Sequence, residues 1–157
     1  MGHMSDTPHD PRLLPQIARF MSGDLPPAHQ AMGIRPDLWL KEAEKGRVLF
    51  RWPNDGSRDI GNGRVFGGWI AGLSDNVVSM CMATALEDGE GFTTQDLQVK
   101  IFRPVMGDLI EIEAWVKNRS RTTGYVEAEW RLPNGKVAVK VIAWKAIRPR
   151  EAFERKD

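Results

Sequence analysis

The sequence has little that would support a disulfide, a metal site or a membrane span. Cys81 is the only cysteine in 157 residues, which excludes an intrachain disulfide and a cysteine-based zinc site and is typical of the reducing cytoplasm. No apolar run is long enough to span a bilayer, and there is no glycine-rich nucleotide loop or metal-ligand cluster. Lys and Arg number 22 against 21 Asp and Glu, so neither nucleic acid nor an anionic membrane is favoured as a partner. We therefore expect a cytoplasmic protein without metal or cofactor.

The length is sufficient for one domain with its own hydrophobic core. We interpret residues 1–4 as a cloning remnant. Residues 5–27 are rich in proline and polar groups, so we expect a peripheral segment with a short amphipathic helix after Pro11. The main domain is expected at residues 28–150, beginning with one further helical turn, and residues 151–157 form a tail.

Residues 67–86 have the pattern of a helix that is apolar on nearly all sides, with Asp75 as its only charged residue before the closing turn. Such a helix is buried rather than lying on a surface. Alternating apolar and polar residues, bounded by turn formers, predict two strands before this helix and four after it. These strands are expected at residues 37–44, 47–52, 92–102, 109–117, 125–132 and 137–147.

This order of elements predicts an α+β fold in which a curled antiparallel sheet wraps around one long central helix. One helix cannot cover both faces of a six-stranded sheet. A partner subunit is therefore expected to cover part of the remaining surface, which makes the protein a dimer at least.

The start of the long helix and its single carboxylate are the candidate chemical groups. Gly67 and Gly68 allow a ligand to approach the backbone closely, and the first N–H groups of a helix have no intrahelical partner. That arrangement can stabilise a carbonyl oxygen as it becomes an oxyanion. Asp75 lies a little over two turns further on, where an unpaired carboxylate is costly. Alternatively, the glycines serve turn geometry and packing, and Asp75 caps a loop or a neighbouring helix.

Several short motifs resemble those of PaaI-like hotdog-fold thioesterases, in the 4-hydroxybenzoyl-CoA thioesterase superfamily. The family signature, His-Gly-Gly followed by Leu-x-Asp, is similar to Phe66-Gly67-Gly68 with Leu73 and Asp75-Asn76. The family's later strand and turn are similar to Thr93-Thr94-x-Asp96-Leu97, Phe102-Arg103-Pro104 and Gly107-Asp108. The resemblance covers about residues 28–147. It implies the hotdog fold, a homodimer or homotetramer, and hydrolysis of an acyl-CoA thioester to the free acid and CoA.

The resemblance also implies roles for individual residues. The Gly67 backbone N–H supplies the oxyanion hole, and Asp75 acts as general base or nucleophile at a site that another subunit completes. Thr94 matches the Ser/Thr position that helps to orient the attacking water. Asn62 lies near the loop residue that binds the thioester or the water.

The sequence departs from the family pattern at Phe66, which stands where the motif has His. The loss of that His bears on the activity, the substrate type or both. Phe66, Gly68 and Trp69 are candidate substrate-binding residues that line an apolar or aromatic acyl pocket. The alternative is that Phe66 and Trp69 are core aromatics.

Two other classes of function were compared with thioester hydrolysis. Hotdog hydratases and dehydratases need a His paired with an acidic residue, and no His follows His29, which precedes the fold proper, so this class is disfavoured. A non-catalytic hotdog module that binds acyl-CoA or only oligomerises is favoured by Phe66, whereas Asp75 favours catalysis. Cys81 is expected to be a structural thiol. Several arginines are candidates for the CoA phosphates, with none preferred.

Overall fold

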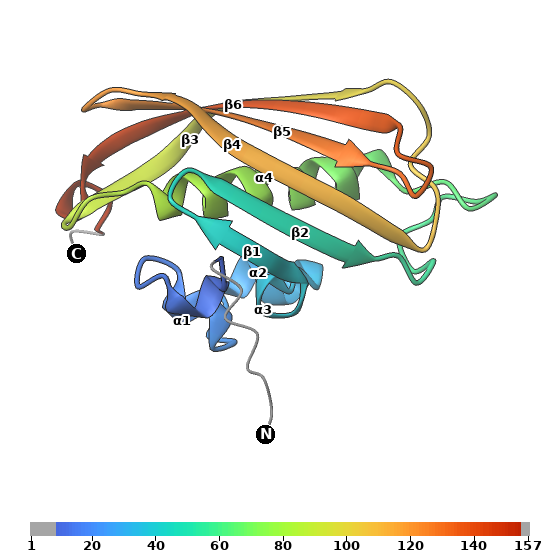
Figure 1. Cartoon of the computed structure of the whole chain (residues 1–157), viewed down its shortest axis with the longest axis horizontal. Helices are drawn as coiled ribbons and strands as arrows, with labels where there is room; N and C mark the ends of the chain where they lie inside the picture. The colour runs from blue at the N-terminus through green and yellow to red at the C-terminus, as the bar shows by residue number, and fades with distance from the viewer. Residues whose placement is uncertain (1–8, 155–157) are drawn as a thin grey trace.

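The computed structural model describes residues 9–154. The expected remnant at residues 1–4 and the last three residues of the expected tail lie outside the described residues. Figure 1 shows a curved sheet that wraps around one long helix, α4 (Gly67–Thr84). The expected α+β architecture is therefore confirmed.

Six strands form one sheet in the order β1-β2-β4-β5-β6-β3, and all neighbouring strands are antiparallel. The strands are β1 (Leu40–Glu44), β2 (Arg47–Pro53), β3 (Glu90–Ile101), β4 (Leu109–Arg119), β5 (Thr123–Arg131) and β6 (Val137–Pro149). The edge strand β3 follows α4 in the chain but pairs with β6, the last strand. This pairing brings side chains of the C-terminal strand beside the strand that leaves the central helix.

Short helices flank the sheet in the chain. They are η1 (Pro11–Leu13), α1 (Ala18–Met21), α2 (Pro27–Met32), α3 (Pro36–Trp39) and η2 (Arg150–Phe153). In Figure 1, α1, α2 and α3 lie below β1 and α4, on the opposite side from strands β3 to β6. Ile17, between η1 and α1, is fully buried in the core. None of the helices within residues 9–154 is long and apolar enough to cross a membrane.

Two predictions about the N-terminal part of the chain are wrong. The helix expected after Pro11 is divided into η1 and α1, because Pro15 lies between them and has no N–H to donate to a helical turn. The strand expected from residue 37 begins only at Leu40. Pro36 occupies the first position of α3, where its fixed φ favours a helical turn over a strand.

The helix α4 supplies the centre of the core. Leu73 and Val77 are fully buried among inward-facing side chains of β4 and β5, whose burial alternates along the strand as expected for a sheet with one covered face. The buried hydroxyl of Ser74 accepts a hydrogen bond of 3.0 Å from the indole N–H of Trp130. Even this polar group therefore has a partner in the core.

The expectation that α4 is buried on nearly all sides is wrong for one stripe of the helix. Gly67 and Gly68 are exposed, and Gly72, Asp75 and Ser79 are partly exposed. These positions recur at helical spacing and so lie along one side of α4. The sheet covers the rest of the helix, and this stripe carries the candidate site.

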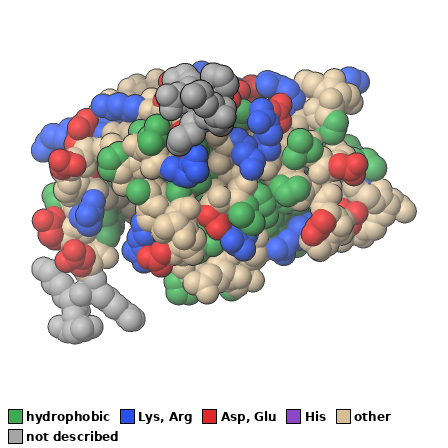
Figure 2. Space-filling model, turned by 60° about the horizontal axis from the view of Figure 1, so that its bottom comes forward, with side chains coloured by type: hydrophobic (Ala, Val, Ile, Leu, Met, Phe, Trp, Pro, Cys, Tyr) green, Lys and Arg blue, Asp and Glu red, His purple; other side chains and the backbone are tan. Residues whose placement is uncertain are grey.

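The charged side chains form a mixed surface. Acidic and basic groups are interspersed with hydrophobic ones over the face that Figure 2 shows. This distribution agrees with the near balance of charge in the whole chain, for which the net charge is +1. Such a surface gives little long-range attraction for a polyanion.

Candidate active site

Asp75 lies at the junction between the central helix and an edge strand. Its Oδ1 accepts a hydrogen bond of 3.1 Å from the hydroxyl of Thr94 on β3. The pairing of β3 with β6 shifts register between Thr94 and Asp96; such an irregularity locally re-aims side chains. Thr94 is partly buried, and nearly half of the Asp75 side chain (47%) is exposed. The carboxylate is thus held by the protein and still open to a ligand.

A lysine that the sequence analysis missed completes this arrangement. Lys145 on β6 is the cross-strand partner of Thr94, and its side chain is 0% exposed. Its Nζ lies 2.6 Å from Thr94 Oγ1, 2.9 Å from Ser79 Oγ and 3.6 Å from Asp75 Oδ1. Burial lowers the pKa of Lys145, and attraction to the Asp75 carboxylate partly offsets that effect.

The sequence does contain a signal for Lys145. The inward positions of β6 alternate as Val139, Val141, Ala143 and Lys145, all fully buried. A lysine in the register of inward apolar residues must bury its ammonium group or bend out to solvent. Buried lysines are rare unless they are paired. The inward position of Lys145 on β6 therefore indicates that its ammonium group has a buried polar or acidic partner.

His29 on α2 also lies at the site, contrary to the expectation that it precedes the fold proper. Its Nε2 lies 2.7 Å from Nδ2 of Asn76, and burial lowers the pKa of His29, an effect that Asp75 partly offsets. His29, Asp75, Asn76 and Ser79 all line one cavity of about 170 Å³. The helix α2 therefore forms one wall of the space in front of Asp75.

Two polar atoms at this cavity have no protein partner. Within residues 9–154, Asn76 Oδ1 and His29 Nδ1 are buried and make no hydrogen bond. Buried polar groups are usually satisfied by protein or by water. These two atoms are thus buried without a hydrogen-bond partner beside the candidate base.

The N-terminus of α4 presents a second group of candidate residues. Gly67 and Gly68 are exposed, and their N–H groups have no acceptor within the described part of the chain. Phe66, the N-cap residue, is 54% exposed, and its ring covers Gly68 so closely that a β-carbon there would lie 2.5 Å from the ring. The first N–H groups of a helix have no intrahelical acceptor, and the oxyanion role expected for the Gly67 N–H stays a prediction.

The structure does not bring Gly67 and Asp75 of one chain together. They are eight positions apart in the helix, which corresponds to about 12 Å along the axis. A carbonyl group at hydrogen-bond distance from the Gly67 N–H is therefore out of reach of Asp75 in the same chain.

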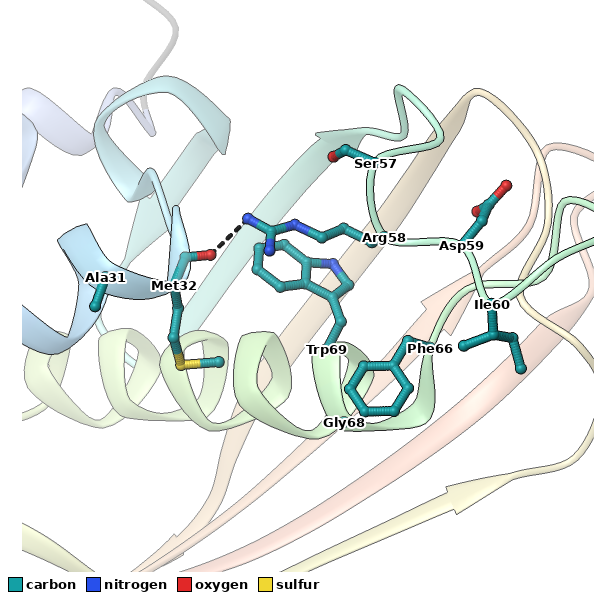
Figure 3. A pocket seen from close by; sticks show the side chains of 9 residues that line it. All are labelled: Ala31, Met32, Ser57, Arg58, Asp59, Ile60, Phe66, Gly68 and Trp69. Atoms are coloured by element: carbon teal, nitrogen blue, oxygen red, sulfur yellow. Dashed lines mark hydrogen bonds between the residues drawn. The ribbon is translucent and has the colours of Figure 1, made fainter.

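A larger cavity of about 450 Å³ lies beside the start of α4. Phe66, Gly68 and Trp69 line it, as Figure 3 shows. Trp69 is only 3% exposed and packs edge-on against Trp39, so it is both a core aromatic and a wall of the cavity. Of the three residues that line this cavity and were expected to bind substrate, Phe66 and Gly68 are exposed, and only Trp69 belongs to the core.

Arg58 fixes the other side of this cavity, and the sequence analysis did not single it out. Its guanidinium lies over the Trp69 ring at 4.0 Å and donates a hydrogen bond of 2.6 Å to the carbonyl oxygen of Met32. In Figure 3 the arginine spans from its loop to the end of α2. It thereby connects α2 to the loop that precedes α4.

Met32 lies between the two cavities and lines both of them. A β-carbon on Gly72 would lie 2.5 Å from Met32 Cε, so the glycine provides the room for this side chain.

Asn62 lies away from both cavities, in an exposed turn with φ of 56°. Within residues 9–154 no cluster of three or more His, Cys, Asp or Glu is arranged to hold a metal ion.

Comparisons with known proteins place this geometry in a family. A model of the thioesterase superfamily matches residues 62–139, about half of the chain. No curated protein sequence matches the chain.

Solved structures share the fold. A mutant thioesterase of Pseudomonas aeruginosa is 16% identical, with a TM-score of 0.72 over 88% of this chain and 97% of that one. A phenylacetic acid degradation-related protein of Ralstonia eutropha is 23% identical, with a TM-score of 0.68 over 83% and 98%. A thioesterase protein of Streptococcus pneumoniae, solved with coenzyme A, is 15% identical, with a TM-score of 0.64 over 70% and 84%. With the family match and the sheet wrapped around α4, these likenesses show that the chain is a hotdog-fold protein and belongs to the thioesterase superfamily.

Proposed function

We propose that this protein hydrolyses an acyl-CoA thioester to the free acid and CoA. The observation that carries the proposal is the Asp75 carboxylate, which lines a cavity. Its Oδ1 accepts a hydrogen bond from Thr94 and lies 3.6 Å from the Lys145 ammonium group. A carboxylate held in one orientation and open to a ligand is suited to act as a base or a nucleophile. Membership of the thioesterase superfamily supports the same reaction.

In the proposed reaction Asp75 takes a proton from a water molecule as the water oxygen attacks the thioester carbonyl. The oxyanion that forms is stabilised by the Gly67 N–H, and its collapse expels the CoA thiolate. In the nucleophilic alternative, Asp75 attacks the carbonyl itself and water then hydrolyses the resulting anhydride. Thr94 orients the carboxylate in both routes and helps to orient the attacking water in the first.

We further propose that two chains form each site. Because Gly67 and Asp75 of one chain are about 12 Å apart along α4, the Gly67 N–H of one chain would act with Asp75 of its partner. The long edge strand β3 has an unpaired side that a second chain can cover. Exposed apolar side chains near the start of α4 and the end of β3 support the same contact; they are Ile60, Phe66, Ile101, Phe102 and Met106. A dimer or a dimer of dimers satisfies this arrangement.

The acyl group is proposed to occupy the cavity lined by Phe66, Gly68 and Trp69. The Streptococcus pneumoniae structure with coenzyme A supports CoA as the carrier. Asn62 is retained as a proposed substrate contact, although it reaches neither cavity of the single chain. The cytoplasmic location expected from the sequence belongs to the same proposal.

A second candidate function is a non-catalytic module that binds acyl-CoA. The observation that favours it is Phe66, which stands at the position of the motif His and places a ring over Gly68. The two functions differ in one simple respect. A binding module leaves acyl-CoA intact, whereas a thioesterase releases the thiol.

The test is a thiol-release assay with acyl-CoAs that carry short, medium-chain and aromatic acyl groups, combined with mass spectrometry of the bound ligand. Hydrolysis of at least one of these substrates would support the proposed reaction. Recovery of intact acyl-CoA from a saturable complex would support the binding module instead. An absence of both binding and hydrolysis across the panel would contradict the two functions together.

Complementation tests whether two chains form one site. Gly67→Pro removes the proposed oxyanion donor at the first position of α4, where proline is tolerated, and Asp75→Asn removes the base. If each site uses Gly67 of one chain and Asp75 of the other, every mixed dimer has one intact site. Dissociating and reassociating an equal mixture then restores about a quarter of the parent activity in randomly formed dimers. No restoration, with mixed dimers verified by mass spectrometry, would contradict the shared site.

A further inference from the structure

Lys145 is the buried charged side chain of the described residues, and it has no chemical step in the proposed reaction. An ammonium group at 0% exposure is costly unless it is paired and hydrogen-bonded. The aromatic ring of Phe92, 5.3 Å from Nζ, is a weak partner for a cation. Nζ instead meets two hydroxyl groups and, at longer range, the Asp75 carboxylate. The lysine is thus buried at the same junction as the candidate base.

The directions of these hydrogen bonds follow from the chemistry of the groups. A lysine ammonium has three donors and no acceptor, so Nζ donates to Thr94 Oγ1 and to Ser79 Oγ. The hydroxyl of Thr94 has one proton, which is then free to point at Asp75 Oδ1, 3.1 Å away. Without the lysine, that proton has other acceptors available, including the solvent. The result is an ordered chain from Lys145 through Thr94 to Asp75.

This chain leaves the two oxygens of Asp75 in different surroundings. Oδ1 accepts from Thr94 and faces the ammonium group. Oδ2 accepts no hydrogen bond from residues 9–154. A carboxylate fixed through one oxygen presents the other in a defined direction, as a base or nucleophile requires.

We propose that Lys145 is a positioning residue for the hydrolysis, which orients Asp75 by directing the hydroxyl proton of Thr94 onto it. This inference rests on the proposed thioesterase function. It assigns a role to a residue outside the motifs that the family resemblance brought forward. Lys145 acts through Thr94 and Asp75 and does not itself contact the substrate.

The groups that face Lys145 limit what else can titrate near it. Asp75 and Cys81 face it from α4, and burial raises the pKa of the Cys81 thiol to about 12, so this thiol stays neutral. His29, from α2, interacts with Asp75 across the cavity. Thr94 and Phe92 face it from β3. A loss of activity at alkaline pH that depends on Lys145 therefore reports the lysine itself.

The first test compares Lys145→Met with the parent in the thiol-release assay, with Lys140→Met as the matched control. Lys140 lies on the same strand, but it is partly exposed and pairs at 3.9 Å with Glu127. Lys145→Met is expected to lower kcat about 30- to 100-fold while KM changes less than about threefold. The parent is expected to lose activity as the pH rises toward the ordinary pKa of lysine, and Lys145→Met is expected to lack this alkaline limb. An unchanged kcat, or the same alkaline limb in both proteins, would overturn the proposal.

A double-variant comparison separates positioning from a general structural effect. If Lys145 acts through the Thr94 hydroxyl, adding Lys145→Met to Thr94→Val lowers kcat no further than Thr94→Val alone. Fully additive losses in these two variants would contradict the proposed route. Circular dichroism and size-exclusion chromatography verify that each variant is folded and assembled as the parent is.

A measurement without substrate keeps the proposal testable if no thioester is hydrolysed. In protein labelled with ¹⁵N-lysine, the Lys145 ammonium is expected to give an NMR signal protected from solvent exchange, which Thr94→Val shifts or removes. No protected signal, or one indifferent to Thr94→Val, would overturn the inference. A protected, Thr94-dependent signal in a protein without turnover would refute the proposed function but leave the hydrogen-bond chain in place.

Discussion

The hydroxyl of Thr94 on the edge strand β3 donates a 3.1 Å hydrogen bond to the carboxylate of Asp75 on α4. This contact joins the sheet edge to the central helix at the point where the helix is open to a ligand. Lys145 supports it from the neighbouring strand. The position of the candidate base therefore depends on the pairing of β3 with β6 as much as on the helix that carries it.

Removal of the Thr94 hydroxyl is expected to lower kcat about 10- to 100-fold, because a charge-assisted hydrogen bond to Asp75 is lost. Thr94→Val keeps the shape of the side chain, and Thr94→Ser, which keeps the hydroxyl, is expected to retain most of the activity. Thr93→Ala is the matched control, since Thr93 is exposed on the same strand. Equal activity of the parent and Thr94→Val would contradict the assigned role.

Met32→Ala is expected to widen the range of acyl groups that the protein hydrolyses. The side chain separates the cavities of about 170 Å³ and 450 Å³, so its removal would join them along α4. The ratio of kcat/KM for a bulky acyl-CoA to that for a short one should rise about tenfold. Leu38→Ala, at an exposed position of α3, is the control. An unchanged ratio would show that Met32 does not limit the acyl pocket.

Acidification is expected to destabilise the protein through His29. Burial lowers its pKa in the folded state, so the unfolded chain binds the proton more readily. By linkage, this contribution to stability is complete above the ordinary pKa of histidine and is lost as the pH falls toward the lowered value. His29 is partly exposed, so solvent screening keeps this loss of stability small. Thermal unfolding between pH 7.5 and pH 5 checks it, and His29→Phe should weaken the pH dependence. A variant with the parent's full dependence would exclude His29 as its source.

Cys81 is expected to be inert toward thiol reagents in the native protein. The side chain is fully buried, and burial raises the pKa of the thiol to about 12, so almost no thiolate is present at neutral pH. Reaction with a chromogenic disulfide should be complete only after denaturation. Rapid labelling of the native protein would show that the core around α4 opens easily. Inert Cys81 also means that the thiol-release assay measures only the thiol of the substrate.

The main elements were predictable because their signals are local. The apolar pattern of residues 67–86 and the alternation in the last three strands identified the helix and most of the sheet within about two residues. Pro15 and Pro36 caused the errors at the N-terminus: Pro15 divided the expected helix, and Pro36 began a helical turn where a strand was expected. The predictions failed in the N-terminal segment, where the apolar pattern is short and weak.

The candidate site was only partly predictable because much of it depends on tertiary contacts. Asp75 and Thr94 followed from motifs, whereas the contact of His29 with Asn76 joins residues 47 positions apart. Lys145 approaches Thr94 only through the pairing of β3 with β6. The local pattern of β6 indicates that Lys145 is buried, but the partner that it meets is set by the tertiary fold.

The most direct test of the account is the rate of thiol release by Asp75→Asn on the best acyl-CoA of the panel. Asn has nearly the same shape but is a poor base and nucleophile. The account predicts that kcat falls at least about 1,000-fold, whereas Asp88→Asn, an exposed change of the same charge, leaves it unchanged. Asp75→Asn that remains folded, oligomeric and as active as the parent would contradict the assignment of Asp75 as the base or nucleophile.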